Sequence, residues 1–269
     1  MKLLKTTLIL LLIVVVVLYG ATVISQRLSG KDVRPDISCP EEILEVSVYD
    51  PEIVLMKDVT ASDKQDGDLT DRVQILSISK LVTNNTAKVT YLVFDNDGNM
   101  DTLVRQVRYT DYSRPVFSIK RPLIYSENEA ITLLDRLQVK DVIDGDITSA
   151  VRVSALSGTS DAEIYTVSLQ VTNSMGDTAR LTVPVVLQDH TAFRPDIRLN
   201  TYLTYIHIGD AFHAQSYLTS LSTAEGPVDT SKVQITSTVD TSTAGTYYVY
   251  YRYPYNGTMG LAVLTVVVQ

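Results

Sequence analysis

The sequence has few of the residues that form enzyme sites or disulfide-bonded domains. Cys39 is its single cysteine, so no intramolecular disulfide can form. The three histidines, His190, His207 and His213, do not have the spacing of a zinc site. The sequence contains no G-x-S-x-G, H-E-x-x-H or phosphate-binding glycine loop. We therefore do not expect an enzyme.

Basic stripes and helix-forming stretches are missing as well. The net charge is −8, and acidic and basic residues are interspersed rather than grouped. Without a basic stripe to follow a phosphate backbone, we expect no nucleic-acid partner. Alanine-rich and glutamate-rich stretches are absent, whereas β-branched residues, threonine and tyrosine dominate. This composition favours an all-β fold.

The N-terminal segment differs from the rest of the chain. An apolar run from Thr7 to Ile24 follows Lys2 and Lys5. Spanning a bilayer takes about 20 apolar residues, while a cleavable signal needs only about 7–15. We expect residues 1–25 to form a signal-anchor helix that crosses the cell membrane once, with the C-terminal ectodomain outside. Cleavage after the Val-Ile-Ser sequence is the alternative, and it would give a secreted protein.

A repeat of about 80 residues follows this segment. "RPDIS", "RPVFS" and "RPDIR" begin at Arg34, Arg114 and Arg194, 80 residues apart each time. "DGDLTDRV" and "DGDITSAV" begin 78 residues apart, and the third copy reads "EGPVDTSKV". Internal repeats of this kind indicate repeated structural units. The predicted parts are a stalk and three domains, at residues 26–33, 34–112, 113–192 and 193–269.

Each repeat ends in an alternating strand, a turn and another strand. The three copies read "AKVTYLVFDNDGN", "YTVSLQVTNSMGD" and "YYVYYRYPYNGTM". Strict alternation is typical of half-buried strands in antiparallel sheets. Asp97-Gly98 is a strong hairpin signal, because glycine accepts the positive φ of such turns. The sequence therefore predicts three small β-sandwiches in tandem.

These repeats resemble tandem bacterial immunoglobulin-like domains of surface and secreted proteins. The resemblance rests on the D-x-x-D-G-D-[LI]-T block, the alternating strand with its glycine turn, and the Arg-Pro seam. It covers about residues 34 to 269, and the third repeat departs from it by losing the acidic block. The resemblance implies three immunoglobulin-like antiparallel sandwiches and a bacterial source. It identifies an architecture rather than an activity.

The acidic blocks of the first two repeats have two interpretations. Calcium takes about six to eight oxygen ligands, and the repeats could supply several of them. The structural alternative is an Asx-turn, with Thr70 and Thr148 capping the next short turn. Because the third repeat keeps the glycine without the acids, we interpret the block first as a turn, with calcium the one candidate cofactor. The candidate calcium ligands are Asp63, Asp66, Asp68, Asp141, Asp144 and Asp146.

The third repeat is rich in tyrosine, with nine of the sixteen tyrosines between residues 202 and 255. Alternation in "YYVYYRYPY" predicts that Tyr248, Tyr250 and Arg252 point outward. Tyrosine and arginine are favoured at binding surfaces, so these three residues are a candidate binding patch. The simpler interpretation is that tyrosine is a good strand former.

Together these features predict a non-enzymatic, membrane-anchored surface protein. Proline at each seam limits flexibility, so the domains are expected to form a semi-rigid stalk for adhesion or protein interaction. One alternative is a carbohydrate-binding module that stacks sugars on the outward tyrosines. The other is an adhesin stiffened by calcium. The sequence does not identify the protein or glycan ligand.

Overall fold

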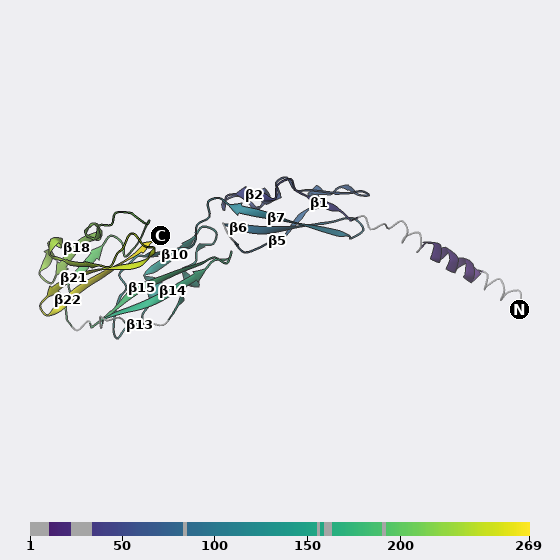
Figure 1. Ribbon diagram of the computed structural model, residues 1–269. Helices are drawn as coiled ribbons and strands as arrows, with labels where there is room; N and C mark the ends of the chain where they lie inside the picture. The colour runs from purple at the N-terminus through teal and green to yellow at the C-terminus, as the bar shows by residue number, and fades with distance from the viewer. Residues whose placement is uncertain (1–10, 23–33, 83–84, 155–156, 159–162, 190–191) are drawn as a thin grey trace, which may run out of the picture. The chain divides into compact units, whose positions relative to one another are not determined.

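The computed structural model describes residues 11–22, 34–82, 85–154, 157–158, 163–189 and 192–269. Two compact units make up the chain, Met1–Thr110 and Asp111–Gln269 (Figure 1). An α-helix covers residues 11–22. Among the described residues, no helix has both the length and the apolar character needed to span a bilayer. The other residues of the predicted anchor, 1–10 and 23–25, lie outside the described residues.

The first unit contains two sheets, with strand orders β1-β3-β4 and β2-β7-β6-β5. Among the described strands of this unit, only β2 and β7 pair in parallel. The 3-10 helices η1 (Glu52–Met56) and η2 (Thr70–Arg72) flank β3 and β4. The strands are β1 (Asp36–Ser38), β2 (Ile43–Val46), β3 (Thr60–Asp63), β4 (Gly67–Asp68), β5 (Gln74–Ile78), β6 (Thr86–Phe94) and β7 (Met100–Tyr109).

Alternation along β6 explains the core of this unit. Val89, Tyr91 and Val93 are fully buried, while Lys88 on the opposite face is exposed. The buried residues pack against residues of the facing sheet, including Ile37. Burying a side chain of this size contributes roughly 1.5–3 kcal/mol, so the pattern fixes which face of the strand is inward. The predicted half-buried strands and all-β fold are confirmed.

The second unit repeats this arrangement twice. The second sheet pair of the chain has the strand orders β11-β10-β8 and β12-β14-β15-β9, with β13 also paired to β14. Parallel pairing of β9 with β15 repeats that of β2 with β7. The 3-10 helices are η3 (Leu133–Asp135) and η4 (Thr148–Ala150). The strands are β8 (Val116–Ile119), β9 (Ile124–Ser126), β10 (Leu137–Asp141), β11 (Gly145–Asp146), β12 (Arg152–Val153), β13 (Ser157–Gly158), β14 (Ile164–Thr172) and β15 (Thr178–Gln188).

The third sheet pair has the orders β16-β18-β19 and β17-β22-β21-β20. Here β17 and β22 are the parallel pair. The 3-10 helices are η5 (Ala214–Tyr217) and η6 (Thr230–Lys232). The strands are β16 (Asp196–Leu199), β17 (Leu203–Ile206), β18 (Leu218–Thr223), β19 (Gly226–Val228), β20 (Gln234–Ser237), β21 (Gly245–Tyr255) and β22 (Thr258–Val268).

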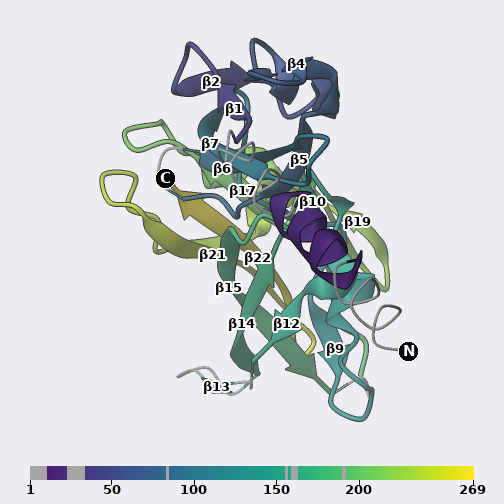
Figure 2. The ribbon, with the colours of Figure 1, turned by 90° about the vertical axis from the view of Figure 1, so that its right-hand side faces the viewer.

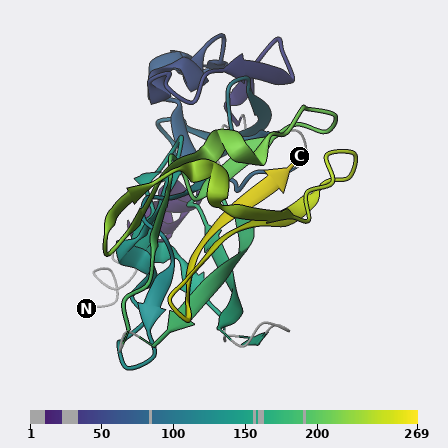
Figure 3. The ribbon, with the colours of Figure 1, turned by 90° about the vertical axis from the view of Figure 1, so that its left-hand side faces the viewer.

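The second and third sheet pairs pack directly on each other. Figure 2 shows β22, in yellow, beside the teal strand β15, and Figure 3 shows the same two pairs from the opposite side. Most of their buried apolar residues belong to one contiguous cluster, and Ile164, Val186 and Leu261 form a smaller one. Since residues 111–269 form one compact unit, the predicted domain boundary near residue 193 stays a prediction.

Candidate functional site

The acidic turn of the first sheet pair uses its carboxylates to hold the backbone. Asp63 is 8% exposed, and its Oδ1 accepts hydrogen bonds from the amides of Gln65 and Asp66 at 2.6 and 2.9 Å. Asp68 Oδ1 accepts one from the Thr70 amide at 2.9 Å. Gly67 between them has a φ of 78°, which favours glycine. These are Asx-type bonds, as the turn interpretation predicts.

Asp66 has a different role, because it joins the turn to a hairpin. Its Oδ2 accepts a bond from the Asn96 amide at 2.7 Å, and its Oδ1 accepts one from Asn96 Nδ2 at 2.6 Å. Asn96 lies in the tight turn between β6 and β7. The D-G-D block therefore ties one sheet of the pair to the hairpin of the other.

The second sheet pair repeats these contacts almost residue for residue. Asp141 Oδ1 accepts from the amides of Ile143 and Asp144, both at 2.9 Å. Asp144 accepts from the Ser174 amide and hydroxyl, both at 2.6 Å. Asp146 accepts from the Thr148 amide at 3.0 Å. The shared sequence block therefore encodes a shared set of turn bonds.

One difference between the two turns lies at their buried end. In the second pair, Asn173 Nδ2 donates to Asp141 Oδ2 at 3.0 Å. The matching residue of the first pair is Asp95, a carboxylate that cannot donate when ionised. Asp63 Oδ2 is buried there and has no hydrogen-bond partner among the residues that the structure describes. An unpaired buried acceptor costs about 1–3 kcal/mol, so the first turn is the less well satisfied.

The third sheet pair makes its turn without the buried aspartate. Thr223 takes the place of the buried aspartate, and its Oγ1 accepts from the Glu225 amide at 3.4 Å. Thr223 pairs directly with Gly226, so this turn is one residue shorter than the others. Asp229 caps η6 by accepting from the Ser231 amide at 2.8 Å. The fold thus tolerates a turn with fewer charges.

Hydrogen bonding also sets the acidity of these groups. The Thr148 hydroxyl, Gln138 and the Thr148 amide lower the pKa of Asp146 to about 2. The Thr70 side chain and amide lower the pKa of Asp68. Among the described residues, no group of three or more His, Cys, Asp or Glu side chains could hold a metal ion. The carboxylates are engaged in turn bonds, and the calcium assignment stays a prediction.

The predicted tyrosine patch lies mostly against the second sheet pair rather than facing open solvent. Tyr248 OH donates to the Thr182 carbonyl at 3.2 Å. Tyr250 packs against the buried cluster of Ile164, Val186 and Leu261. Both rings lie on the outer face of β21 as the alternation predicts, but this face contacts the second sheet pair, and the binding patch stays a prediction. The Arg252 guanidinium lies 4.8 Å from the centroid of the Tyr250 ring.

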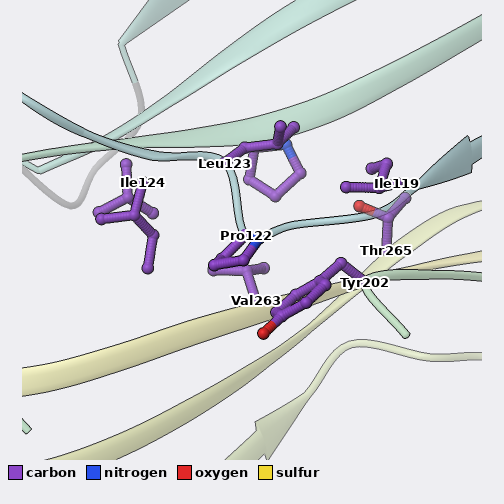
Figure 4. Close-up of a pocket in the computed structure, with 9 residues that line it drawn as sticks. Ile119, Pro122, Leu123, Ile124, Tyr202, Val263 and Thr265 are labelled. Carbon is purple, nitrogen blue, oxygen red and sulfur yellow. The ribbon is translucent and has the colours of Figure 1, made fainter. Parts of the chain in front are cut away.

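This interface is closely packed. Figure 4 shows Pro122, Tyr202 and Val263 around a cavity of about 10 Å³ between the two sheet pairs. Such a volume holds at most about one water molecule. Arg194 forms a bidentate ion pair with Glu163, in which its two terminal guanidinium nitrogens lie 3.0 and 3.1 Å from the carboxylate oxygens. Its sequence counterpart Arg114 is 78% exposed and lies 3.4 Å from Asp177.

Sequence reasoning missed two apolar grooves, one in each of the first two sheet pairs. Each lies between a 3-10 helix and an edge strand of the larger sheet, β5 in the first pair and β12 in the second. The repeat contains a signal for them, because Ile53 and Ile131 are 78 residues apart, the spacing of the acidic blocks. Neither residue belongs to an alternating strand, which is why the periodicity did not single them out.

Comparisons with known proteins give a weak likeness of fold. No family model and no curated protein matches the chain. The M60 catalytic domain with CBM51-1 and CBM51-2 from Clostridium perfringens ZmpB is 14% identical, with a TM-score of 0.25 over 88% of this chain and 31% of that one. The Protocadherin GammaB4 extracellular domain is 13% identical, with a TM-score of 0.20 over 88% and 50%.

Human CDH23 EC21-23 is 12% identical, with a TM-score of 0.21 over 87% of this chain and 100% of that one. The chain spans 31% to 42% of the length of the three Clostridium perfringens ZmpB structures that it matches. At these identities and scores the likeness supports no functional argument.

Proposed function

We propose that this chain is a non-enzymatic surface protein of the bacterial immunoglobulin-like type, anchored in the membrane by its apolar N-terminal segment. Its sheet pairs serve as a stalk for adhesion or protein interaction. The main support is the way the polar side chains are used: the aspartates of the repeated block bond to turns and hairpins, and the tyrosines join two sheet pairs. These aspartates and tyrosines stabilise a stiff scaffold rather than forming a catalytic site.

Stiffness between the second and third sheet pairs follows from their interface. Leu261 is 7% exposed, and the Arg194–Glu163 pair lies at the seam between the second and third repeats. A closely packed seam leaves little freedom for hinge motion. The carbohydrate-binding alternative has less support, because Tyr248 and Tyr250 contact the neighbouring sheet pair. The calcium-stiffened alternative is tested separately below.

Topology in the cell tests this proposal. In a Cys39→Ser background, Asp97→Cys places a single thiol at the exposed tip of the β6–β7 hairpin. A maleimide that cannot cross membranes should label this thiol on intact bacterial cells. The matched variant Lys2→Cys should be labelled only after the cells are broken. Labelling of Asp97→Cys only in broken cells would contradict a surface location.

A further inference from the structure

The first sheet pair has an apolar groove of about 570 Å³ beside the terminal strand β5. Its floor is formed by Met56, Val59, Val73 and Ile75, and Ile53 on its wall is 72% exposed. The charged residues that line it, Glu52 and Asp71, are both acidic and exposed. The groove thus combines an apolar floor with a negatively charged rim.

The second sheet pair has a groove of about 590 Å³ at the same place in the fold. Its wall residues include Ile131, Leu134 and Val153, and Asp135 is its charged residue. Cross-strand pairing establishes the match: Val153 lies opposite Leu169, as Ile75 lies opposite Tyr91. Leu134 and Val153 are 40% and 47% exposed.

In the third sheet pair, the segment that matches the groove wall contains an aromatic residue. Ile235 is the matching strand residue, because it lies opposite Tyr251. Tyr251 OH donates to the Ala214 carbonyl at 2.7 Å, as Tyr91 OH donates to the Leu55 carbonyl at 2.6 Å. Ala214 therefore corresponds to Leu55, and the residue two positions earlier, Phe212, corresponds to Ile53.

Phe212 stacks on Tyr217 with ring centroids 5.6 Å apart. Both rings and Ile235 pack against the core of this sheet pair. The third pair thus has a planar aromatic side chain, Phe212, in the segment that matches the groove wall of the first pair. The first two pairs have aliphatic residues at the same position and an open groove.

We propose that the two grooves are binding sites for an aromatic side chain of an extended protein segment, with a basic residue next to the aromatic one. The aromatic ring takes the position that corresponds to Phe212 in the third pair. The basic residue is favoured by Glu52 and Asp71 at one groove and by Asp135 at the other. This inference rests on the proposed interaction function and names the partner chemistry.

Tryptophan provides a clean probe, because the chain contains none. The probe is the peptide acetyl-Thr-Lys-Trp-Lys-Thr-amide, titrated into the full-length chain at about 0.15 M salt to screen unspecific attraction. The peptide fluorescence, excited where tyrosine does not absorb, should shift to shorter wavelength as the indole leaves water. We expect saturation at one peptide per groove. The peptide with alanine in place of tryptophan should not displace it.

Matched variants locate the two sites. Ile53→Glu and Val153→Glu alter exposed groove walls, so each should remove one of the two sites, and the double variant should remove both. Val104→Glu is the control, because Val104 is an equally apolar residue, 58% exposed, that lines neither groove. Phe212→Ala should add a third site by emptying the matching position.

Three outcomes would overturn the proposal: no fluorescence shift, a shift unchanged in the Ile53→Glu, Val153→Glu double variant, or an equal loss in Val104→Glu. The last would mean general adsorption to apolar surface. If Phe212→Ala binds no additional peptide, with its fold verified by circular dichroism, then Phe212 does not fill a position equivalent to the grooves. The cell-labelling experiment is independent, so failure of the surface location and failure of the grooves are separately visible.

Discussion

The hairpins β6–β7 and β21–β22 are both antiparallel but have opposite surroundings on their outer faces. Thr90 lies opposite Val104 in the first, and Tyr250 lies opposite Val263 at the same place in the third. Val104 is 58% exposed, whereas Val263 packs into the cluster around Leu261. The two hairpins thus share antiparallel backbone pairing, but the residues on their outer faces differ. The comparison shows that a repeated sandwich becomes part of a larger rigid unit through a few outward side chains.

The largest expected effect comes from placing a charge in this interface. Leu261→Asp should destabilise residues 111–269 by roughly 3 kcal/mol or more, because it buries an unpaired carboxylate and removes apolar contact. Its matched variant is Thr102→Asp, which changes the exposed counterpart in the first unit and should have an effect within about 0.5 kcal/mol. Urea unfolding with hydrogen exchange measured for each unit checks both. Equal effects would mean that the interface contributes no stability.

Asn173 and Asp95 are the matching residues beside the two acidic turns, and exchanging asparagine and aspartate at these positions should change stability in opposite directions. Asn173→Asp removes the donor to Asp141 and should destabilise the second unit by about 1–3 kcal/mol. Asp95→Asn combined with Asn99→Asp recreates the second turn in the first unit and should stabilise it by about 1 kcal/mol, because Asp63 Oδ2 gains a donor. Thermal unfolding checks both variants. A stability loss in the Asp95→Asn, Asn99→Asp variant would show that the two turns are not equivalent.

The seam arginines provide a smaller comparison. Arg194→Ala should destabilise the second unit by about 1 kcal/mol, since the Arg194–Glu163 pair is partly screened by solvent. Arg114→Ala, at the same place in the repeat, should change stability by less than about 0.5 kcal/mol because Arg114 is exposed. Denaturant midpoints of the two variants give the comparison. A larger loss of stability in Arg114→Ala than in Arg194→Ala would contradict the stabilising role proposed for the Arg194–Glu163 pair.

Acid should selectively weaken the turn around Asp146. The pKa of this carboxyl is about 2 in the folded chain and about 3.9 when unfolded, so its stabilising effect is present above pH 4 and is lost as the pH falls toward 2. The melting-temperature difference between the native chain and Asp146→Asn should therefore shrink between pH 5 and pH 2.5. A difference independent of pH would mean that the charge of Asp146 is unimportant.

Calcium should have the smallest effect. The aspartates of both turns already accept bonds from backbone amides, so melting with millimolar calcium and with chelator should give the same temperature for each unit. A shift of several degrees in the first two sheet pairs, abolished by Asp68→Asn or Asp146→Asn, would establish the calcium site instead. An equal shift in the third pair would indicate a general charge effect.

Much of the fold could be predicted from short-range pattern. Alternation placed Val89, Tyr91 and Val93 inward, and the glycine after Asp97 predicted the hairpin that Gly98 makes with a φ of 84°. The turn role of the acidic block also followed from sequence, because an Asx bond spans two residues. Asp63 and Asp68 accept from amides two residues on, whereas Asp66, directly before Gly67, bonds to Asn96.

What the sequence determined by itself is local: strand faces, turns and the 80-residue repeat, each set by residues within a few positions of one another. Tertiary structure determined what the outward side chains do. Tyr248 and Tyr250 alternate outward as predicted, yet they contact residues more than sixty positions away in the second sheet pair. Such burial depends on long-range packing of two sheets, and no local period encodes which neighbour covers an outer face. The grooves beside Ile53 and Ile131 arise in the same way, from a 3-10 helix and a strand that meet only in the folded chain.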